Sequence, residues 1–258
     1  MTTTIRLQTV GAALVVAAVV VAPAFAQSRS TSRGFTGSWE AYPLRGEGFG
    51  SGVQPKVRVS PPAPIPEPPL RQPYLDEFRA AQARNAELVR KGLPPVSTGM
   101  ACIPEGMPGM MQATFPMEIL ETPGQITIIE EAFNHVRRIY LGVPALAPED
   151  AEPRFAGQST GRWEGAVLVV TTVGVKDSVH FRNTPHSMKI RITERMRLVN
   201  DEMLENQVTV EDGEYLTKPW TWTWMYKRWP GYKIQEYVCE DNRYFEDPTL
   251  RYQRLRVQ

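Results

Sequence analysis

The sequence predicts a mainly β protein, an antiparallel up-and-down barrel of about eight strands like those of the lipocalin group, preceded by a helix and a proline-rich extension. Three observations support this. After residue 124, short alternating or β-branched stretches follow one another. Turn residues, and no helical pattern, separate them. Most of the 23 prolines lie before residue 125. A barrel of about eight strands encloses a space that side chains fill or one small ligand occupies.

The first segment, Met1–Ala26, has the pattern of a secretory signal peptide. Arg6 supplies the positive charge, Val10–Val21 is apolar, and Ala24-Phe25-Ala26 is an A-x-A cleavage site before Gln27. An uncleaved anchor is the alternative, but the apolar run is shorter than the ~20 residues that span a membrane. We therefore expect a periplasmic or secreted protein without a transmembrane segment after cleavage.

Export places the two cysteines, Cys102 and Cys239, in an oxidising compartment. A disulfide between them would close a loop of 137 residues, which stabilises a fold by roughly 4–5 kcal/mol in the chain-entropy model. Two free buried thiols or a thiolate metal site are the alternatives. The three histidines have no zinc-binding spacing, so no metal or cofactor is expected.

The segment between the signal and the barrel has two parts. Residues 27–73 are rich in Pro, Ser and Gly and are expected to form an extended linker. Residues 74–124 are expected to form a helix and a loop that pack on the barrel. The helix is predicted over Tyr74–Lys91, because acidic residues fill its first turn, Arg90 and Lys91 fill its last, and Gly92 ends it.

Residues 125–258 are expected to form the barrel. The predicted strands are Ile126–Ile129, Val136–Tyr140, a stretch from Arg162 that turns at Gly165 into Val167–Thr171, then Met188–Val199, Leu204–Val210, Trp220–Trp229 and Ile234–Cys239.

Alternation along Met188–Val199 assigns its faces. Ile190, Ile192 and Met196 share one face, which should point into the barrel, and Glu194 lies on that face. A lone carboxylate among apolar side chains costs several kcal/mol, so Glu194 needs an Arg, a His, a ligand or a water as its partner. His186 has the same parity but should lie near the other end of the strand.

Two interpretations of Glu194 and His186 stay open. They are polar anchors or an acid–base pair in a cavity, or Glu194 is a structural group satisfied by a neighbour or turned outward by a bulge. Four aromatic side chains share one face of the strand over Trp220–Trp229: Trp220, Trp222, Trp224 and Tyr226. They form either core packing or a flat wall for an aromatic ligand.

The motif series resembles that of a large family of uncharacterised exported bacterial proteins, common in sphingomonads and acidobacteria. The resemblance covers about Tyr74 to Arg243 and lies in six motifs: C-x-P-x-G-M-P at Cys102–Pro108, G-x-W-E-G at Gly161–Gly165, P-H-S at Pro185–Ser187, T-E-R at Thr193–Arg195, K-P-W-T at Lys218–Thr221 and E-Y-x-C at Glu236–Cys239. It implies membership and no activity. The family usually has two carboxylates after G-x-W-E-G, where this chain has Ala166 and Thr171.

The matching positions add Trp163, Glu164 and Arg195 to the candidate ligand-binding residues. G-x-W-x-G before an apolar strand is also similar to calycin barrels, which is an analogy of fold only.

Three functions follow from these observations. The first is a module that binds a hydrophobic or aromatic small molecule inside the barrel. The second is a hydrolase, lyase or isomerase that uses His186 and Glu194. The third is an envelope protein whose barrel is filled by its own side chains. With 29 basic against 28 acidic side chains, the chain lacks the charge imbalance of a nucleic-acid-binding protein.

Overall fold

The computed structural model describes residues 34–44, 50–93, 95 and 102–239, Met1, and the backbone of two short strands that pair with each other, β10 (Tyr244–Asp247) and β11 (Tyr252–Leu255). The predicted signal peptide, its cleavage site and the residues directly after it lie outside the described residues. The chain divides into two compact units, Met1–Ser30 and Thr31–Gln258, and all elements below belong to the second.

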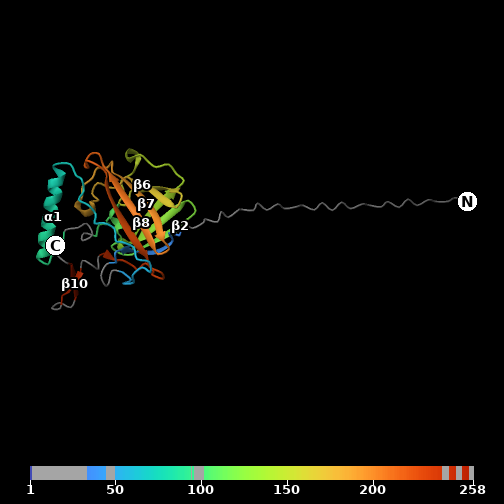
Figure 1. Cartoon of the computed structure of the whole chain (residues 1–258), viewed down its shortest axis with the longest axis horizontal. Coiled ribbons are helices and arrows are strands. Elements are labelled where there is room, and N and C mark those ends of the chain that lie inside the picture. Colours follow the sequence, from blue (N-terminus) through green and yellow to red (C-terminus); the bar gives the residue numbers. More distant parts are fainter. Residues whose placement is uncertain are drawn as a thin grey trace. The chain divides into compact units, whose positions relative to one another are not determined.

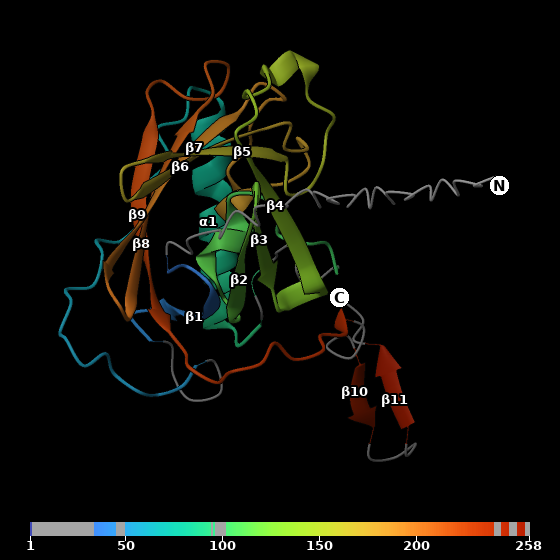
Figure 2. The ribbon, with the colours of Figure 1, turned by 90° about the vertical axis from the view of Figure 1, so that its right-hand side faces the viewer.

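The predicted β-barrel is confirmed. Nine strands close into one barrel in chain order, and β9 pairs with β1 to complete it (Figure 2). All neighbours are antiparallel except β4 and β5, which are parallel. The strands are β1 (Gly37–Tyr42), β2 (Met117–Thr122), β3 (Gln125–Glu130), β4 (His135–Leu141), β5 (Gln158–Glu164), β6 (Val167–Val173), β7 (Arg191–Asn200), β8 (Met203–Glu211) and β9 (Trp220–Arg228).

Local sequence explains the tight turns between strands. Gly124 between β2 and β3 has a φ of +76°, and Gly165 between β5 and β6 has a φ of +60°. Residues other than glycine rarely adopt this left-handed backbone conformation. Alternation along each strand then directs apolar side chains inward: the inward row of β3 includes Ile126 and Ile128, both buried.

The ends of the barrel differ from the sequence-based expectation. Strand β1 lies inside the segment expected to be an extended linker, and its Trp39 is fully buried. Strand β2 lies inside residues 74–124, which were expected to form a helix and a loop, so the barrel includes strands before residue 125. Residues 234–239, expected to form the last strand, contain no strand. The barrel is therefore closed by a strand that precedes the helix. Only Trp39 and Ala41 give β1 an inward apolar row, and Gly37 and Pro43 flank it, which is a weak strand pattern.

The proline-rich segment after β1 packs on the barrel. Leu70 is buried and forms an isolated bridge with Leu216. The indole Nε1 of Trp220 donates a hydrogen bond of 2.9 Å to the backbone oxygen of Pro66. Proline residues keep this segment extended, so its backbone carbonyl groups can accept hydrogen bonds from side chains of the barrel.

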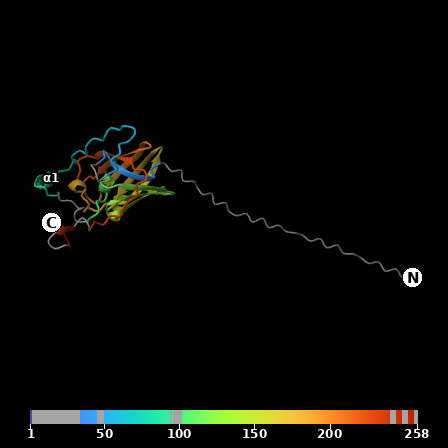
Figure 3. The same ribbon diagram turned by 90° about the horizontal axis from the view of Figure 1, so that it is seen from below.

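The predicted helix is confirmed as α1 (Tyr74–Arg90), which lies outside the ring of strands (Figures 1 and 3). Its buried residue is Phe78. The side chain of Gln82 donates a 3.0 Å hydrogen bond to the backbone oxygen of Arg182, so α1 is fastened to the short 3-10 helix η5 (Phe181–Asn183). None of the helices in the described part of the chain is long and apolar enough to cross a membrane.

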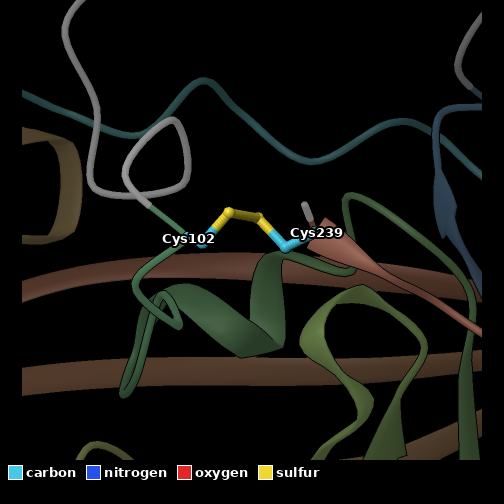
Figure 4. The surroundings of a disulfide bond; sticks show 2 residues. All are labelled: Cys102 and Cys239. Atoms are coloured by element: carbon cyan, nitrogen blue, oxygen red, sulfur yellow. A yellow bond between two sulfur atoms is a disulfide. The ribbon is translucent and has the colours of Figure 1, made fainter. Parts of the chain in front are cut away.

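The predicted cysteine pair is confirmed. The sulfurs of Cys102 and Cys239 lie at bonding distance, and their Cα atoms are 5.6 Å apart (Figure 4). The bond joins the loop before β2 to the segment after β9. The two cysteines lie 137 residues apart in the sequence, and the strands β2 to β9 lie between them.

Candidate functional site

A belt of polar side chains crosses the interior of the barrel. Each of six consecutive strands, β4 to β9, contributes one residue: Arg137, Ser159, Thr172, Glu194, Asn206 and Tyr226. Arg137 forms an ion pair with Glu194, and both are buried. Arg137 also donates to Ser159 Oγ at 3.1 Å and to Thr172 Oγ1 at 2.9 Å. Asn206 donates to the other carboxylate oxygen of Glu194 at 2.9 Å.

Glu194 therefore has protein partners on both carboxylate oxygens. Breaking one side of a buried, hydrogen-bonded pair typically costs about 3–5 kcal/mol, because the other charge is left uncompensated. Tyr226 extends the belt, since its hydroxyl lies 3.5 Å from the Asn206 amide nitrogen and donates to the Met111 backbone oxygen at 2.5 Å. Burial raises the pKa of Tyr226, so it stays a neutral donor. These contacts fit a structural role for Glu194.

One carboxyl next to this belt has no partner. Glu130, the last residue of β3, is 1% exposed, and neither of its oxygens has a hydrogen-bond partner among the described residues. Desolvation, and secondarily the charge of Glu105, raise the pKa of Glu130 to about 9. The side chain is consequently protonated and uncharged at neutral pH.

The aromatic side chains form a cluster at the end of the barrel that η5 covers. Trp220, Trp222 and Trp224 point inward from β9, and all three are buried. Neighbouring indoles are 4.5 and 5.3 Å apart. Phe181 of η5 stacks on Trp222 with ring centroids 5.5 Å apart and an interplanar angle of 20°. Phe181 thus occupies the flat face of Trp222, which the sequence predicts as a possible wall for an aromatic ligand.

Polar atoms without partners surround this cluster. Within the described residues, Thr184 Oγ1, His186 Nε2 and Trp222 Nε1 are buried and have no hydrogen-bond partner. A buried polar group left unpaired costs about 1–3 kcal/mol. The His186 Nδ1 atom lies 2.8 Å from the Ser187 backbone oxygen. A carbonyl oxygen only accepts, so Nδ1 carries the proton in the neutral ring and Nε2 presents a lone pair.

Two cavities lie on either side of η5. A small one, about 20 Å³, is lined by Phe181, Thr184, His186 and Trp220, among others. A larger groove of about 620 Å³ lies between α1 and η5 and is lined by Phe78, Ala81, Leu88, His180 and Asn183, among others. Pro185 lines both cavities. The segment from His180 to Pro185 is therefore a thin wall between an open groove and the aromatic cluster.

The backbone of this wall is strained. Arg182 and Asn183, both following Phe181, have φ values of +54° and +64°. The left-handed conformation costs roughly 1–2 kcal/mol for a residue with a side chain. Tertiary contacts compensate for this cost: the Phe181 stack and the hydrogen bond from Gln82 to the Arg182 backbone. Strained non-glycine residues cluster at ligand clamps and switch regions.

His186 lies near a serine and an aspartate, but the three side chains are not a catalytic triad. The Ser187 hydroxyl donates to Asp212 at 3.1 Å, and the Ser187 backbone nitrogen donates to the same carboxylate at 2.6 Å. Asp212 also accepts the backbone nitrogens of Glu214 and Tyr215. The Asp212 carboxylate thus holds the turn that follows it. His186 makes its hydrogen bond to the Ser187 backbone oxygen and not to Asp212. A triad requires the acid to orient the imidazole.

The structure brings some predicted residues together and separates others. His186 and the three indoles lie around η5, whereas Glu194 and Tyr226 belong to the polar belt. Glu164 and Arg195 lie on the outside of the barrel and pair with each other at 3.0 Å, half-exposed. Trp163 packs edge-on against Phe35, with ring centroids 5.3 Å apart.

Sequence reasoning missed Phe181 and Thr184. Both lie in a loop, where neither strand nor helix periodicity predicts which way a side chain points. The available signal was an aromatic residue close before P-H-S.

No protein-family model matches this chain, and no curated protein sequence matches it significantly.

Proposed function

We propose that this protein binds a small aromatic molecule carrying a hydroxyl or amine group in the aromatic cluster behind η5, and that Phe181 holds the place of that ligand in the unoccupied protein. The observation that carries the proposal is a set of three buried polar atoms around the Phe181 stack that have no hydrogen-bond partner among the described residues: Thr184 Oγ1, His186 Nε2 and Trp222 Nε1. The resemblance to exported proteins and the disulfide further support a periplasmic or secreted location.

The three atoms define the chemistry of the ligand. The lone pair of His186 Nε2 requires a hydrogen-bond donor, and the Trp222 indole requires an acceptor. A phenolic hydroxyl donates to His186 Nε2, while the ring that carries it replaces Phe181 on the indole face of Trp222. Offset stacking of aromatic rings contributes about 0.5–1.5 kcal/mol beyond the buried area. The ligand class is therefore an aromatic alcohol or amine.

The groove between α1 and η5 supplies the route of entry. Its volume of about 620 Å³ falls within the range of roughly 300–1,000 Å³ usual for small-molecule sites, whereas the inner cavity of about 20 Å³ has room for no such ligand. Withdrawal of Phe181 would join the two. The energy needed to displace Phe181 lowers the apparent affinity of the ligand.

Intrinsic tryptophan fluorescence tests this proposal with two matched probes, 2-naphthol and naphthalene. We expect the wild-type protein to prefer 2-naphthol by about tenfold, which is the contribution of one or two hydrogen bonds. Phe181→Ala should bind 2-naphthol roughly tenfold more tightly, because the competing ring is gone. His186→Leu should lose the preference for the hydroxyl.

Two control variants make the result specific. Phe35→Ala removes a buried aromatic side chain that contacts Trp163, and it should not raise the affinity for 2-naphthol. His135→Leu removes a histidine that lines a different cavity, and it should keep the hydroxyl preference. If neither probe binds the wild type or Phe181→Ala, the barrel is filled by its own side chains and the proposal is wrong.

A second candidate function is hydrolysis of an aromatic ester. It is favoured by the lone pair of His186 Nε2 beside a cavity, the arrangement that a general base requires. Glu194 has no part in it, because that carboxylate is paired with Arg137. With 2-naphthyl acetate as substrate, His186→Gln would lower turnover by about 10²–10⁴-fold in an enzyme and would leave 2-naphthol binding largely intact in a binding protein.

A further inference from the structure

The geometry points to a second ligand site, at the seam between β4 and β5, for an amphipathic carboxylate with an apolar tail. This seam is the parallel junction of the barrel, where pairing covers only Ile139–Leu141 of β4 (Figure 2). The rest of β4, from His135 to Arg138, has no partner strand on this side. A cavity of about 520 Å³ lies here, lined by residues of both strands and of the loops beside them.

The cavity is positively charged. Arg137, Arg138 and Arg154 line it together with His135, and none of its described lining residues is acidic. Because Glu194 compensates the charge of Arg137, Arg138 and Arg154 supply the net positive charge. Arg154 pairs at 2.7 Å with Glu152, but both side chains are more than half exposed, and such pairs contribute little. Lys176 adds a further cation, since its ammonium lies 4.4 Å from the centre of the Phe155 ring, and that ring also lines the cavity.

Two buried nitrogens of the lining residues have no partner. Arg137 Nη1 and His135 Nδ1 make no hydrogen bond within the described part of the chain, although the rest of the Arg137 guanidinium is held by the polar belt. Burial, followed by the charge of Arg137, lowers the pKa of His135. The ring is consequently neutral at pH 7. An anionic head group fits this environment better than a neutral or cationic one does.

The outer part of the cavity is apolar. Tyr140, Val143 and Leu146 line it, and they belong to the small set of large hydrophobic side chains that the described structure leaves exposed. Exposed apolar residues that gather around a concave, charged site mark a binding surface rather than ordinary surface scatter. Together, the cationic floor and the apolar rim match a molecule with a carboxylate at one end and a hydrocarbon chain at the other.

This site is separate from the aromatic cluster. The cavity at the seam and the inner cavity behind η5 share no lining residue. The inference therefore goes beyond the proposed function, and it stands if the aromatic site fails. Phe181→Ala provides a direct check, because it should leave binding at the seam unchanged.

Isothermal titration of the mature protein with decanoate tests the inference, with decanol and acetate as matched probes for the tail and the head. We expect decanoate to bind at least tenfold more tightly than decanol or acetate does. All ligand concentrations stay below the critical micelle concentration. The double variant Arg138→Glu, Arg154→Glu should weaken decanoate binding by about tenfold or more, because two exposed cations become anions.

The double variant Arg195→Glu, Arg197→Glu is the matched control, because it changes the net charge by the same amount. Both arginines are about half exposed and, like Arg154, pair with a glutamate, at 3.0 and 2.7 Å. This variant should bind decanoate as the wild type does. Equal affinity for decanol would overturn the inference, because the head group would then be irrelevant. Equal weakening by the control variant Arg195→Glu, Arg197→Glu would also overturn it, because the effect would then be one of overall charge.

Discussion

Glu130 is the residue whose surroundings differ most from those of its chemical class. It is a carboxyl inside the barrel without a hydrogen-bond partner in the described structure, and burial raises its pKa to about 9. A group whose pKa is raised on folding stabilises the native state only while it is protonated. The stabilisation is complete below its unfolded pKa, near 4.5, and is lost as the pH rises toward the folded value.

We therefore predict that Glu130→Gln removes a pH-dependent loss of stability. Between about pH 5 and pH 9, the free energy of unfolding of the variant should gain on that of the wild type by up to about 1.4 kcal/mol per pH unit. Urea denaturation at a series of pH values measures this difference. Glu118→Gln, at a half-buried position of β2, is the control. A constant difference between wild type and Glu130→Gln across this range would show that Glu130 is ionised in the folded protein.

The residue scale also marks the limit of sequence reasoning. Alternation along β7 correctly placed Glu194 inside the barrel and required a partner for it. It did not identify Arg137 as the partner, because that residue lies on β4, 57 positions earlier. Periodicity assigns a face within one strand, but the contact across a barrel depends on strand order and register, which no local pattern contains.

At the scale of elements, η5 depends on α1. The Gln82 side chain holds the Arg182 backbone oxygen, and the strained turn at Arg182 and Asn183 relies on such contacts. A hydrogen bond of this kind contributes about 0.5–1.5 kcal/mol. The helix is therefore a brace for the wall over the aromatic cluster.

We predict that Gln82→Ala loosens this wall. The backbone amides of Asn183 and Thr184, which donate to His180 and Phe181, should exchange with deuterium about two- to fivefold faster. Hydrogen–deuterium exchange with mass spectrometry measures the change. Gln125→Ala, which removes a side-chain bond to Thr127, is the matched control and should leave the η5 amides unchanged. Unchanged exchange in Gln82→Ala would show that α1 does not hold η5.

The elements themselves were predictable to different degrees. The helix and the strands β3, β4 and β6 to β9 were predicted near their observed bounds, because each has its own periodicity and turn residues. The strand before Gly165 was predicted from Arg162, whereas β5 begins at Gln158. Strands β1 and β2 were missed: six residues flanked by Gly and Pro give β1 too short a pattern, and β2 lies in the segment expected to form a helix and a loop. The position of η5 was not predictable, since two consecutive left-handed residues other than glycine are set by tertiary contacts and not by local preference.

At the scale of the whole molecule, three connections hold segments around the barrel. The Cys102–Cys239 bond joins the loop before β2 to the segment after β9, the proline-rich segment packs on β9 and the loop before it, and α1 braces η5. Each of the three connections lies at or beside the end of the barrel that holds the aromatic cluster. The polar belt, in contrast, is enclosed by the six strands β4 to β9. This division places rigidity in the barrel wall and leaves the region around η5 as the part that can open with the least disruption of the core.

A crystal structure of the protein with 2-naphthol tests this account most directly. We predict that the naphthalene ring lies on Trp222 in the position now held by the Phe181 side chain, with its hydroxyl within hydrogen-bond distance of His186 Nε2, and that η5 is displaced toward the groove beside α1. A complex in which Phe181 keeps its stack on Trp222 while the ligand binds elsewhere would contradict it.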